Sequence, residues 1–193
     1  MHKIFVIDEN TCEIYGNTLP SSRGMGYFKK LLDEAVITIK EYNISNAYLV
    51  NEPVCQSGKQ FIQSVNAVYY DSDYLMVYDT AITPQPRGIL ELKSEKDGCT
   101  ETFETFRAGE PIGICHVEYT KDHAVIYGFE VYEQYRGRGY GTETLLLVLK
   151  YLLDDQISQI RLHVTHANTA AHHMYKHHGF FHKEQLDYWK LVL

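Results

Sequence analysis

The sequence is short of the residues that stabilise small secreted proteins or anchor a protein in a membrane. It contains only 4 cysteines among 193 residues, namely Cys12, Cys55, Cys99 and Cys115. This wide spacing offers neither a disulfide framework nor a zinc site. No apolar run approaches the roughly 18 residues that a membrane span requires, and Asp8 comes too early for a signal peptide. We therefore expect a reduced, cytoplasmic protein that binds no metal and no membrane.

Basic residues are also in short supply. The chain has 18 Lys and Arg against 25 Asp and Glu, which gives a net charge of −7 and a pI near 5.8. A nucleic-acid-binding face needs an excess of positive charge, so no nucleic-acid partner is expected. The hydrophobic fraction of 45% is enough to build a core. The length is compatible with one large domain or two small ones, and a homodimer is left open.

Strand-like and helix-like patterns alternate along the chain. Apolar residues recur at helical spacing in two long and two short stretches, which strand-like segments separate. These helical stretches are residues 25–39, 58–66, 145–153 and 169–178. Two prolines and a glycine within residues 83–88 indicate a linker. We therefore divide the chain into residues 1–80, a linker at 81–88, and residues 89–193.

The two halves carry related motifs. The segment that begins at Arg23 and the segment that begins at Arg136 both read Arg-Gly-x-Gly-Tyr, and the arginines stand 113 positions apart (136 − 23). Further pairs, such as Ile14 with Ile126, keep nearly the same offset. We interpret this pattern as an internal duplication. The alternative is two unrelated αβ segments that share a glycine-rich turn.

The second of these turns, residues 136–142, has the chemistry of an anion site. Glycines let the backbone turn tightly and bring several N–H groups to one point. The first turn of the following helix adds N–H donors and the positive end of its dipole. Arg136 and Arg138 add positive charge. Such a turn is suited to a pyrophosphate.

A dinucleotide-binding fold uses a similar turn, but it requires a parallel βαβ unit with an acidic residue at the end of the second strand. Here Asp154 and Asp155 lie at the end of the helix, and the strand that follows ends in Thr165 and His166. An NAD-type oxidoreductase is therefore disfavoured.

Residues 129–142 resemble the acetyl-CoA-binding motif of the GNAT family of N-acetyltransferases. That motif, Arg/Gln-x-x-Gly-x-Gly/Ala, is met by Arg136, Gly139 and Gly141, and residues 168–180 resemble the second signature of the family. The resemblance covers roughly the second half of the chain. It implies an α/β (α+β) fold with a mixed, mostly antiparallel, splayed sheet flanked by helices. The first half would be a truncated repeat of the same type.

The resemblance also implies where acetyl-CoA, the co-substrate, would bind. Backbone N–H groups of the turn would hold the pyrophosphate, and main-chain groups of Phe129 and Val131 would pair with the pantetheine arm. Asn168 would contact that arm or order a water near it. The residues expected to bind the cofactor are Phe129, Val131, Arg136, Gly137, Arg138, Gly139, Tyr140, Gly141, Thr142 and Asn168.

Three residues are the candidates for catalysis under the same resemblance. The Val131 N–H would polarise the thioester carbonyl. Tyr175 would protonate the leaving thiolate as general acid; the alternative is a helix residue that only packs on the sheet. Glu130 lies on the right strand for a base, although strand alternation points it away from the acceptor. The general base is left open.

The expected protein is an N-acetyltransferase. It would move an acetyl group from acetyl-CoA to the primary amine of a small molecule or peptide by direct attack. The alternative is a non-catalytic acyl-CoA-binding or regulatory protein of the same fold. The acceptor amine and the acyl-chain preference are not legible in the sequence.

The first half keeps the arginine and the first glycines of the turn, but it lacks other parts of the motif. Phe28 stands where Gly141 stands in the second half, and Ile62 stands where Tyr175 stands. We expect a degenerate half that has lost its own site and helps to form the acceptor site of the second half.

Overall fold

The computed structural model describes residues 2–193 and divides into two compact units. Unit 1 holds the chain up to Asp73 together with Gln185–Leu193, and unit 2 holds Tyr74–Glu184. Two long strands belong to both units, namely β4 (Val68–Tyr78) and β10 (Phe180–Lys190). The boundary thus differs from the predicted linker at 81–88. The boundary between the units falls within β4 and β10. Neither position has a proline- or glycine-rich segment that would mark it in the sequence.

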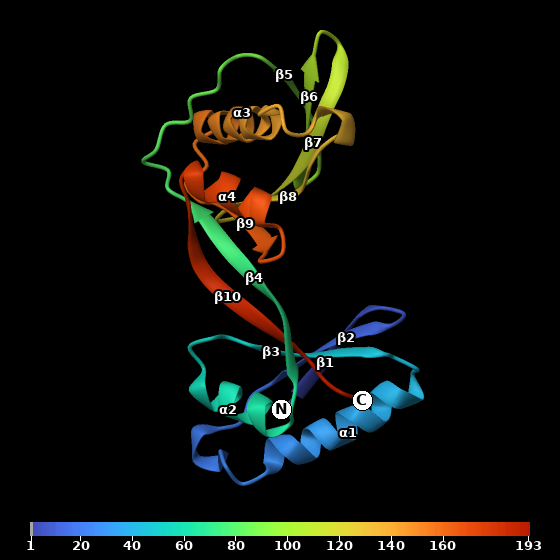
Figure 1. Ribbon diagram of the computed structural model, residues 1–193. Helices are drawn as coiled ribbons and strands as arrows, with labels where there is room; N and C mark the ends of the chain where they lie inside the picture. The colour runs from blue at the N-terminus through green and yellow to red at the C-terminus, as the bar shows by residue number, and fades with distance from the viewer. Residues whose placement is uncertain (1) are drawn as a thin grey trace. The chain divides into compact units, whose positions relative to one another are not determined.

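Unit 1 is a small sheet with two helices (Figure 1). Its strand order is β1-β2-β3-β10-β4, in which β2 and β3 are parallel while the pairs β1–β2 and β3–β10 are antiparallel. The elements that lie wholly in this unit are β1 (His2–Asp8), β2 (Thr11–Gly16), the 3-10 turn η1 (Pro20–Ser22), α1 (Tyr27–Glu41), β3 (Asn46–Asn51) and α2 (Gln56–Ser64).

Unit 2 has the strand order β10-β4-β9-β8-β7-β6-β5. Strands β5 to β8 form an antiparallel meander, and β8 pairs with β9 in parallel. Its own elements are β5 (Glu91–Asp97), β6 (Thr100–Arg107), β7 (Glu110–Tyr119), β8 (Ala124–Val131), the 3-10 turn η2 (Glu133–Tyr135), α3 (Tyr140–Asp154), β9 (Ile160–Thr165) and α4 (Thr169–His177). This mixed, mostly antiparallel sheet flanked by helices confirms the predicted fold class.

Each unit contains a pair of parallel strands that are hydrogen-bonded over only part of their length. In unit 2, pairing of β8 with β9 runs only from Ala124 opposite Ile160 to Ile126 opposite Leu162. In unit 1, the pairing of β2 with β3 stops in the same way at Ile14. Backbone groups of β8 beyond Ile126, and of β2 beyond Ile14, have no partner in the neighbouring parallel strand.

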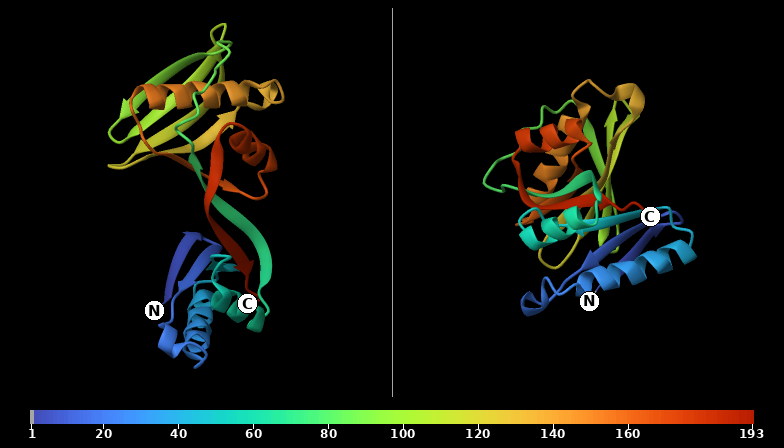
Figure 2. Two further views of the ribbon diagram at one scale, coloured as in Figure 1. Left: turned by 90° about the vertical axis from the view of Figure 1, so that its left-hand side faces the viewer. Right: turned by 60° about the horizontal axis from the view of Figure 1, so that its bottom comes forward.

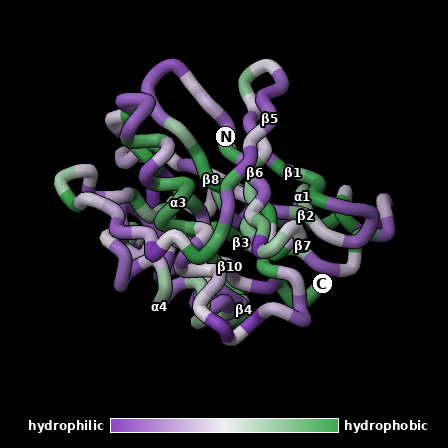
Figure 3. Tube along the Cα trace, turned by 90° about the horizontal axis from the view of Figure 1, so that it is seen from above, coloured by the Kyte–Doolittle hydropathy of each residue, from purple (hydrophilic) through white to green (hydrophobic). Residues whose placement is uncertain are grey.

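Each unit also has its own core. In unit 2, one face of α3 buries Leu145, Val148, Leu149 and Leu152 against the sheet, each no more than 1% exposed. Figure 3 shows the apolar (green) stretches of the α3 trace, and Figure 2 shows the helix lying across the β5–β8 meander. Among the helices of residues 2–193, none combines the length and apolarity that crossing a membrane takes.

The role of β4 in unit 2 can be tested at Met76, which is 0% exposed in that core. Met76→Ala should lower the free energy of unfolding by about 2–5 kcal/mol because it leaves a cavity. Val68→Ala, at the 61% exposed start of the same strand, should cost less than about 0.5 kcal/mol. Urea unfolding of the full chain measures both, and equal effects would contradict the placement of β4.

Candidate functional site

The glycine turn lies between η2 and α3. Gly137 and Gly139 have φ angles of +75° and +78°, in the left-handed region that favours glycine. Gly139 is the N-cap of α3. The first N–H groups of a helix have no hydrogen-bond partner within the helix. The turn therefore presents backbone donors at the positive end of a helix dipole, where an anion is stabilised.

Arg136 ties the turn to strand β8. Its Nε donates to the Val131 carbonyl oxygen at 2.8 Å, and its Nη2 lies 3.2 Å from Glu130 Oε1. Both members of this ion pair are more than half exposed. The predicted base candidate Glu130 thus lies at the surface, beside the Arg136 guanidinium.

The direction of the Val131 N–H follows from the hydrogen bond of the next residue. The N–H of Tyr132 donates to the Ile112 carbonyl oxygen, on the β7 side of the strand. Since successive residues of a strand point their N–H groups to opposite edges, the Val131 N–H points away from β7. Val131 lies beyond Ile126, the last residue of β8 that pairs with β9, so its N–H has no partner in the ladder between these two strands.

Helix α4 brings Tyr175 to the same place. A Cβ atom on Gly141 would lie 3.5 Å from Met174 Sδ and from Val131 Cγ2, and 3.9 Å from the Phe129 ring. The Phe129 ring in turn meets the Tyr175 ring edge to face, with centroids 6.2 Å apart. The start of α3, the end of β8 and helix α4 therefore converge on one spot, as the sequence motifs predict.

The Tyr175 side chain is only 5% exposed. Burial, with a smaller effect from the Cys115 thiol, raises the pKa of its phenol to about 12. The phenol therefore stays protonated at neutral pH and has a proton to give. Its packing against Phe129 and Phe180 also makes it part of the core.

Other predicted residues have structural tasks of their own. Asn168 caps α4, because its Oδ1 accepts a hydrogen bond from the Ala171 N–H at 3.3 Å. The Tyr140 side chain is 5% exposed and hydrogen-bonds Arg107, so only its backbone remains for a ligand at the turn. The Arg138 side chain is exposed, and Thr142 lines a hollow beside α4.

The sequence analysis missed a buried carboxylate behind the turn. Glu143 is 0% exposed, and it accepts hydrogen bonds from the backbone N–H groups of Arg87 at 2.9 Å and Ile89 at 3.1 Å. Burial opposes its ionisation, but these N–H groups and that of Gly88 outweigh burial and lower the pKa of Glu143. No local signal could reveal this pairing, because its members stand more than fifty positions apart in the sequence.

Part of the predicted linker is consequently bound in place. Glu143 holds residues 87–89 against the start of α3, and the Arg87 guanidinium donates to the Gly139 carbonyl oxygen at 3.3 Å. A third arginine, besides Arg136 and Arg138, thus lies at the turn.

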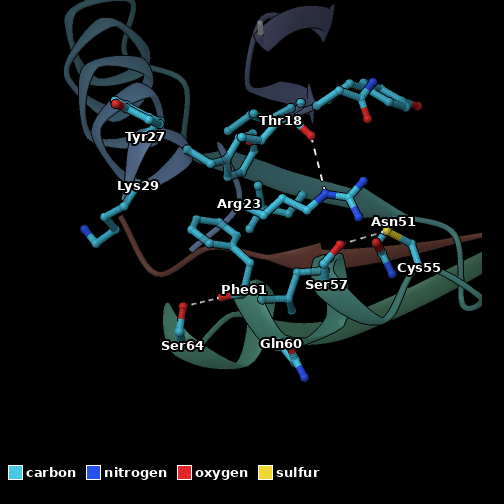
Figure 4. Close-up of a pocket in the computed structure, with 18 of the residues that line it drawn as sticks. Thr18, Arg23, Tyr27, Lys29, Asn51, Cys55, Ser57, Gln60, Phe61 and Ser64 are labelled. Carbon is cyan, nitrogen blue, oxygen red and sulfur yellow. Dashed lines mark hydrogen bonds between the residues drawn. The ribbon is translucent and has the colours of Figure 1, made fainter. Parts of the chain in front are cut away.

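A cavity lies in unit 1, beside the first of the two glycine turns. It has a volume of about 890 Å³ and opens between the parting strands β2 and β3, next to the glycines that precede α1 (Figure 4). Gly24 and Gly26 have φ angles of +75° and +78°, the values found at Gly137 and Gly139. The half that was expected to have lost its site therefore retains an open space.

Several histidines gather between β9, α4 and β10. His172 Nε2 and His182 Nε2 are 2.6 Å apart, and the His182 ring stacks on Tyr74. Burial, and for His172 also the nearby His182, lowers the pKa of both histidines. Within residues 2–193, no three His, Cys, Asp or Glu side chains are grouped as a metal ion would need.

Known proteins similar to this chain identify its family. Residues 67–180, more than half of the 193, match the family described as Acetyltransferase (GNAT) family. The chain belongs to the GNAT family of acetyltransferases. An "Uncharacterized N-acetyltransferase YycN" from Bacillus subtilis is 35% identical to this GNAT protein over 63 residues. The matched segment covers 33% of this chain and 40% of that relative.

Solved structures share the fold at low sequence identity. A GCN5-related N-acetyltransferase from Sphaerobacter thermophilus superposes with a TM-score of 0.79 at 14% identity, covering 98% of this chain and 75% of its own. A tandem GNAT protein from the clavulanic acid biosynthesis pathway superposes with a TM-score of 0.69 at 13% identity, covering 93% and 74%. At such identities the likeness concerns the fold of this GNAT protein and not its substrate.

The buried carboxylate yields a pH-dependent prediction. Glu143→Gln should destabilise the protein by about 1–3 kcal/mol at pH 7, because the N–H groups of residues 87–89 lose their charged acceptor. Since the pKa of Glu143 is lower in the folded protein than its ordinary 4.5, this advantage is present above about pH 4.5. It is lost as the pH falls through the folded pKa.

Urea unfolding at pH 7 and at stepwise lower pH gives the free energies of unfolding of the wild type and of Glu143→Gln. The difference between the two should become smaller as the pH falls. The control is Asp154→Asn, which removes an exposed pair with Lys150 and should cost less than about 0.5 kcal/mol. A difference in unfolding free energy between wild type and Glu143→Gln that stays constant down to acid pH would contradict the role of the Glu143 carboxylate as the charged acceptor for residues 87–89.

Proposed function

We propose that unit 2 transfers an acetyl group from acetyl-CoA to the primary amine of a small molecule or peptide. The observation that carries the proposal is the Val131 N–H, which points away from β7 beyond the end of the β8–β9 ladder, beside the donor-rich turn of α3. An anion and an extended chain can be held there together. Residues 137–142 would bind the pyrophosphate through backbone N–H groups, with Arg136 and Arg138 adding charge.

The chain's own residues then have distinct tasks. Main-chain groups of Phe129 and Val131 would bind the pantetheine arm as if it were an added strand. The Val131 N–H would polarise the thioester carbonyl and stabilise the oxyanion that forms when the amine attacks. Asn168, already a helix cap, would lie near the arm through its amide.

The reaction forms a C–N bond and breaks the C–S bond of the thioester. The CoA sulfur leaves as a thiolate and takes a proton from Tyr175, whose high pKa keeps that proton available at neutral pH. The amine loses a proton to a base or to water. Glu130 is a candidate for that role, although its carboxylate is held in an ion pair with Arg136.

The acceptor is proposed on charge alone. A net charge of −7 favours encounter with a cationic amine. We expect such an enzyme to work in the cytoplasm without a metal, and a homodimer stays open.

We also infer that the two units derive from an internal duplication. Helices α1 and α3 each have 15 residues and begin 113 positions apart (140 − 27), after turns with matching glycine φ angles. Arg23 Nε donates to the Thr18 carbonyl oxygen as Arg136 Nε does to that of Val131. The similarity to a tandem GNAT protein over 93% of the chain supports the same inference.

A second candidate is a protein that binds acyl-CoA without catalysis. The packing of Tyr175 among core residues favours it, since a buried phenol can be purely structural. Release of free CoA thiol from acetyl-CoA across a panel of amines separates the two, because only an enzyme produces it.

The cofactor site can be tested at Gly139. Gly139→Asp should raise the Kd for acetyl-CoA at least tenfold, because it places a carboxylate where the pyrophosphate is proposed to bind. Aspartate tolerates the left-handed conformation better than most residues and is favoured where a helix begins. Isothermal titration measures the affinity.

Gly139→Asn is the matched control, since it has nearly the same shape without the charge and should lose less affinity. Circular dichroism of both variants checks the fold. Equal affinity of wild type and Gly139→Asp would rule out the proposed site.

The general acid can be tested with Tyr175→Phe. Loss of the proton donor should lower kcat about 100-fold or more, while the KM for acetyl-CoA stays within about threefold. Since the pKa of Tyr175 is about 12, wild-type kcat should show no loss from this group between pH 6 and roughly pH 10. Unchanged kcat in a stably folded variant would assign Tyr175 a packing role instead.

A further inference from the structure

The cavity of unit 1 is built like a ligand site, with both polar and apolar groups in its lining. At about 890 Å³ it lies within the range of pockets that hold small molecules and cofactors. The lining combines polar groups, namely the Gly24–Gly26 turn and Arg23, with the apolar side chains of Ile14 and Leu49. An amphiphilic ligand with an anionic end matches such a lining.

The polar part of the lining gathers donors of several kinds. Arg23 is held by its Nε–Thr18 hydrogen bond of 3.4 Å, and Figure 4 shows its guanidinium extending from Thr18 toward Cys55. A Cβ atom at Gly24 or Gly26 would meet nothing within 4 Å, so the space in front of the turn is open. Glu52 is the acidic residue in the lining, and Lys29 is paired with Asp33. Arg23 and the backbone N–H groups of the turn are therefore the donors available to an anion there.

Phe28 limits the length of the ligand. Its ring covers Gly16 so closely that a Cβ on that glycine would overlap it, and it meets the Phe61 ring at 4.6 Å. Gly16 ends β2, beyond the last residue that pairs with β3. A chain running along that strand edge, as proposed for pantetheine in unit 2, would collide with the ring. The two aromatic rings instead offer a surface for a compact apolar or aromatic body.

We propose that the unit 1 cavity binds a compact ligand that carries a phosphate or diphosphate on an apolar or aromatic body, and that it does not transfer an acyl group. The anion would be held by Arg23 and the turn, and the body would lie against Phe28 and Phe61. Ile62 stands at the position that matches Tyr175 (175 − 62 = 113), so no phenol is available there as a proton donor. The site would bind and not catalyse.

Cys55 provides a reporter inside the cavity. It is half-buried in the lining, whereas Cys99 is exposed in unit 2, and Cys12 and Cys115 are buried. Hydrogen bonds from the Ser57 hydroxyl and the Gly58 N–H, with Arg23 nearby, lower the pKa of the Cys55 thiol despite partial burial. In a Cys99→Ser protein, alkylation should therefore report mainly on Cys55.

The experiment uses full-length Gly139→Asp, Cys99→Ser protein, in which the proposed unit 2 site is disabled. ADP, the probe, should bind with one equivalent per chain in isothermal titration and should slow alkylation of Cys55 at least fivefold. Pyrophosphate alone should bind at least tenfold more weakly, because it lacks the aromatic body. Adding Gly26→Asp should weaken ADP binding at least tenfold, and the control Gly26→Asn should weaken it less.

The length limit is tested in the same protein. CoA should bind at least tenfold more weakly than ADP, and Phe28→Gly should remove that difference, whereas Phe28→Leu should keep it.

Absence of ADP binding, unaltered Cys55 alkylation, or CoA affinity equal to that of ADP before substitution would overturn the proposal. If Gly26→Asp does not fold, the Cys55 result decides. The outcome is independent of acyl transfer by unit 2, whose own failure would appear as wild-type protein that neither binds acetyl-CoA nor releases CoA thiol.

Discussion

The parting of β8 from β9 is the constraint on which the candidate active site depends. The strands pair at Ala124, Ile126 and the residue between them, and then separate. A longer ladder would use the Val131 N–H within the sheet. Because backbone groups that lose a strand partner need another one, the exposed edge favours an extended ligand. The bulge near Gly128, where the register with β7 shifts, also lies in this part of β8.

The positive end of α3 depends on a second, less visible interaction. A fully buried carboxylate is costly unless it is well hydrogen-bonded, and Glu143 meets that condition by binding the backbone of Arg87 and Ile89. The same contact delivers the Arg87 guanidinium to Gly139. Glu143 also forms an ion pair with Arg87 Nε at 3.5 Å, so a structural carboxylate fixes the position of this arginine at the turn.

The two units show how one backbone arrangement serves different chemistry. Both contain parting parallel strands and a turn with two left-handed glycines. They differ at Gly141 and Phe28, which decide how closely a ligand can approach the strand edge. They also differ at Tyr175 and Ile62. Under the two proposals, the backbone sets where a ligand can lie, and these side chains set its length and its reaction.

Much of the fold was predictable because its signals are local. The long helix expected at residues 25–39 lies at Tyr27–Glu41, and the short helix expected at residues 58–66 lies at Gln56–Ser64. The residues of the glycine motif also come together as expected, at Gly141, Val131 and Met174. Helical spacing and turn glycines act over a few residues, so the sequence reveals them directly.

The sequence by itself therefore determined the family, the order of elements and the turn that can hold an anion. Only the tertiary structure decided that the last residues of β10 pair with β3, that Glu143 holds residues 87–89, and that Phe28 covers Gly16 beside an open cavity. These contacts join residues far apart in the chain or depend on the direction of one side chain. They follow from packing and from the pairing of buried polar groups, which no short stretch of sequence encodes.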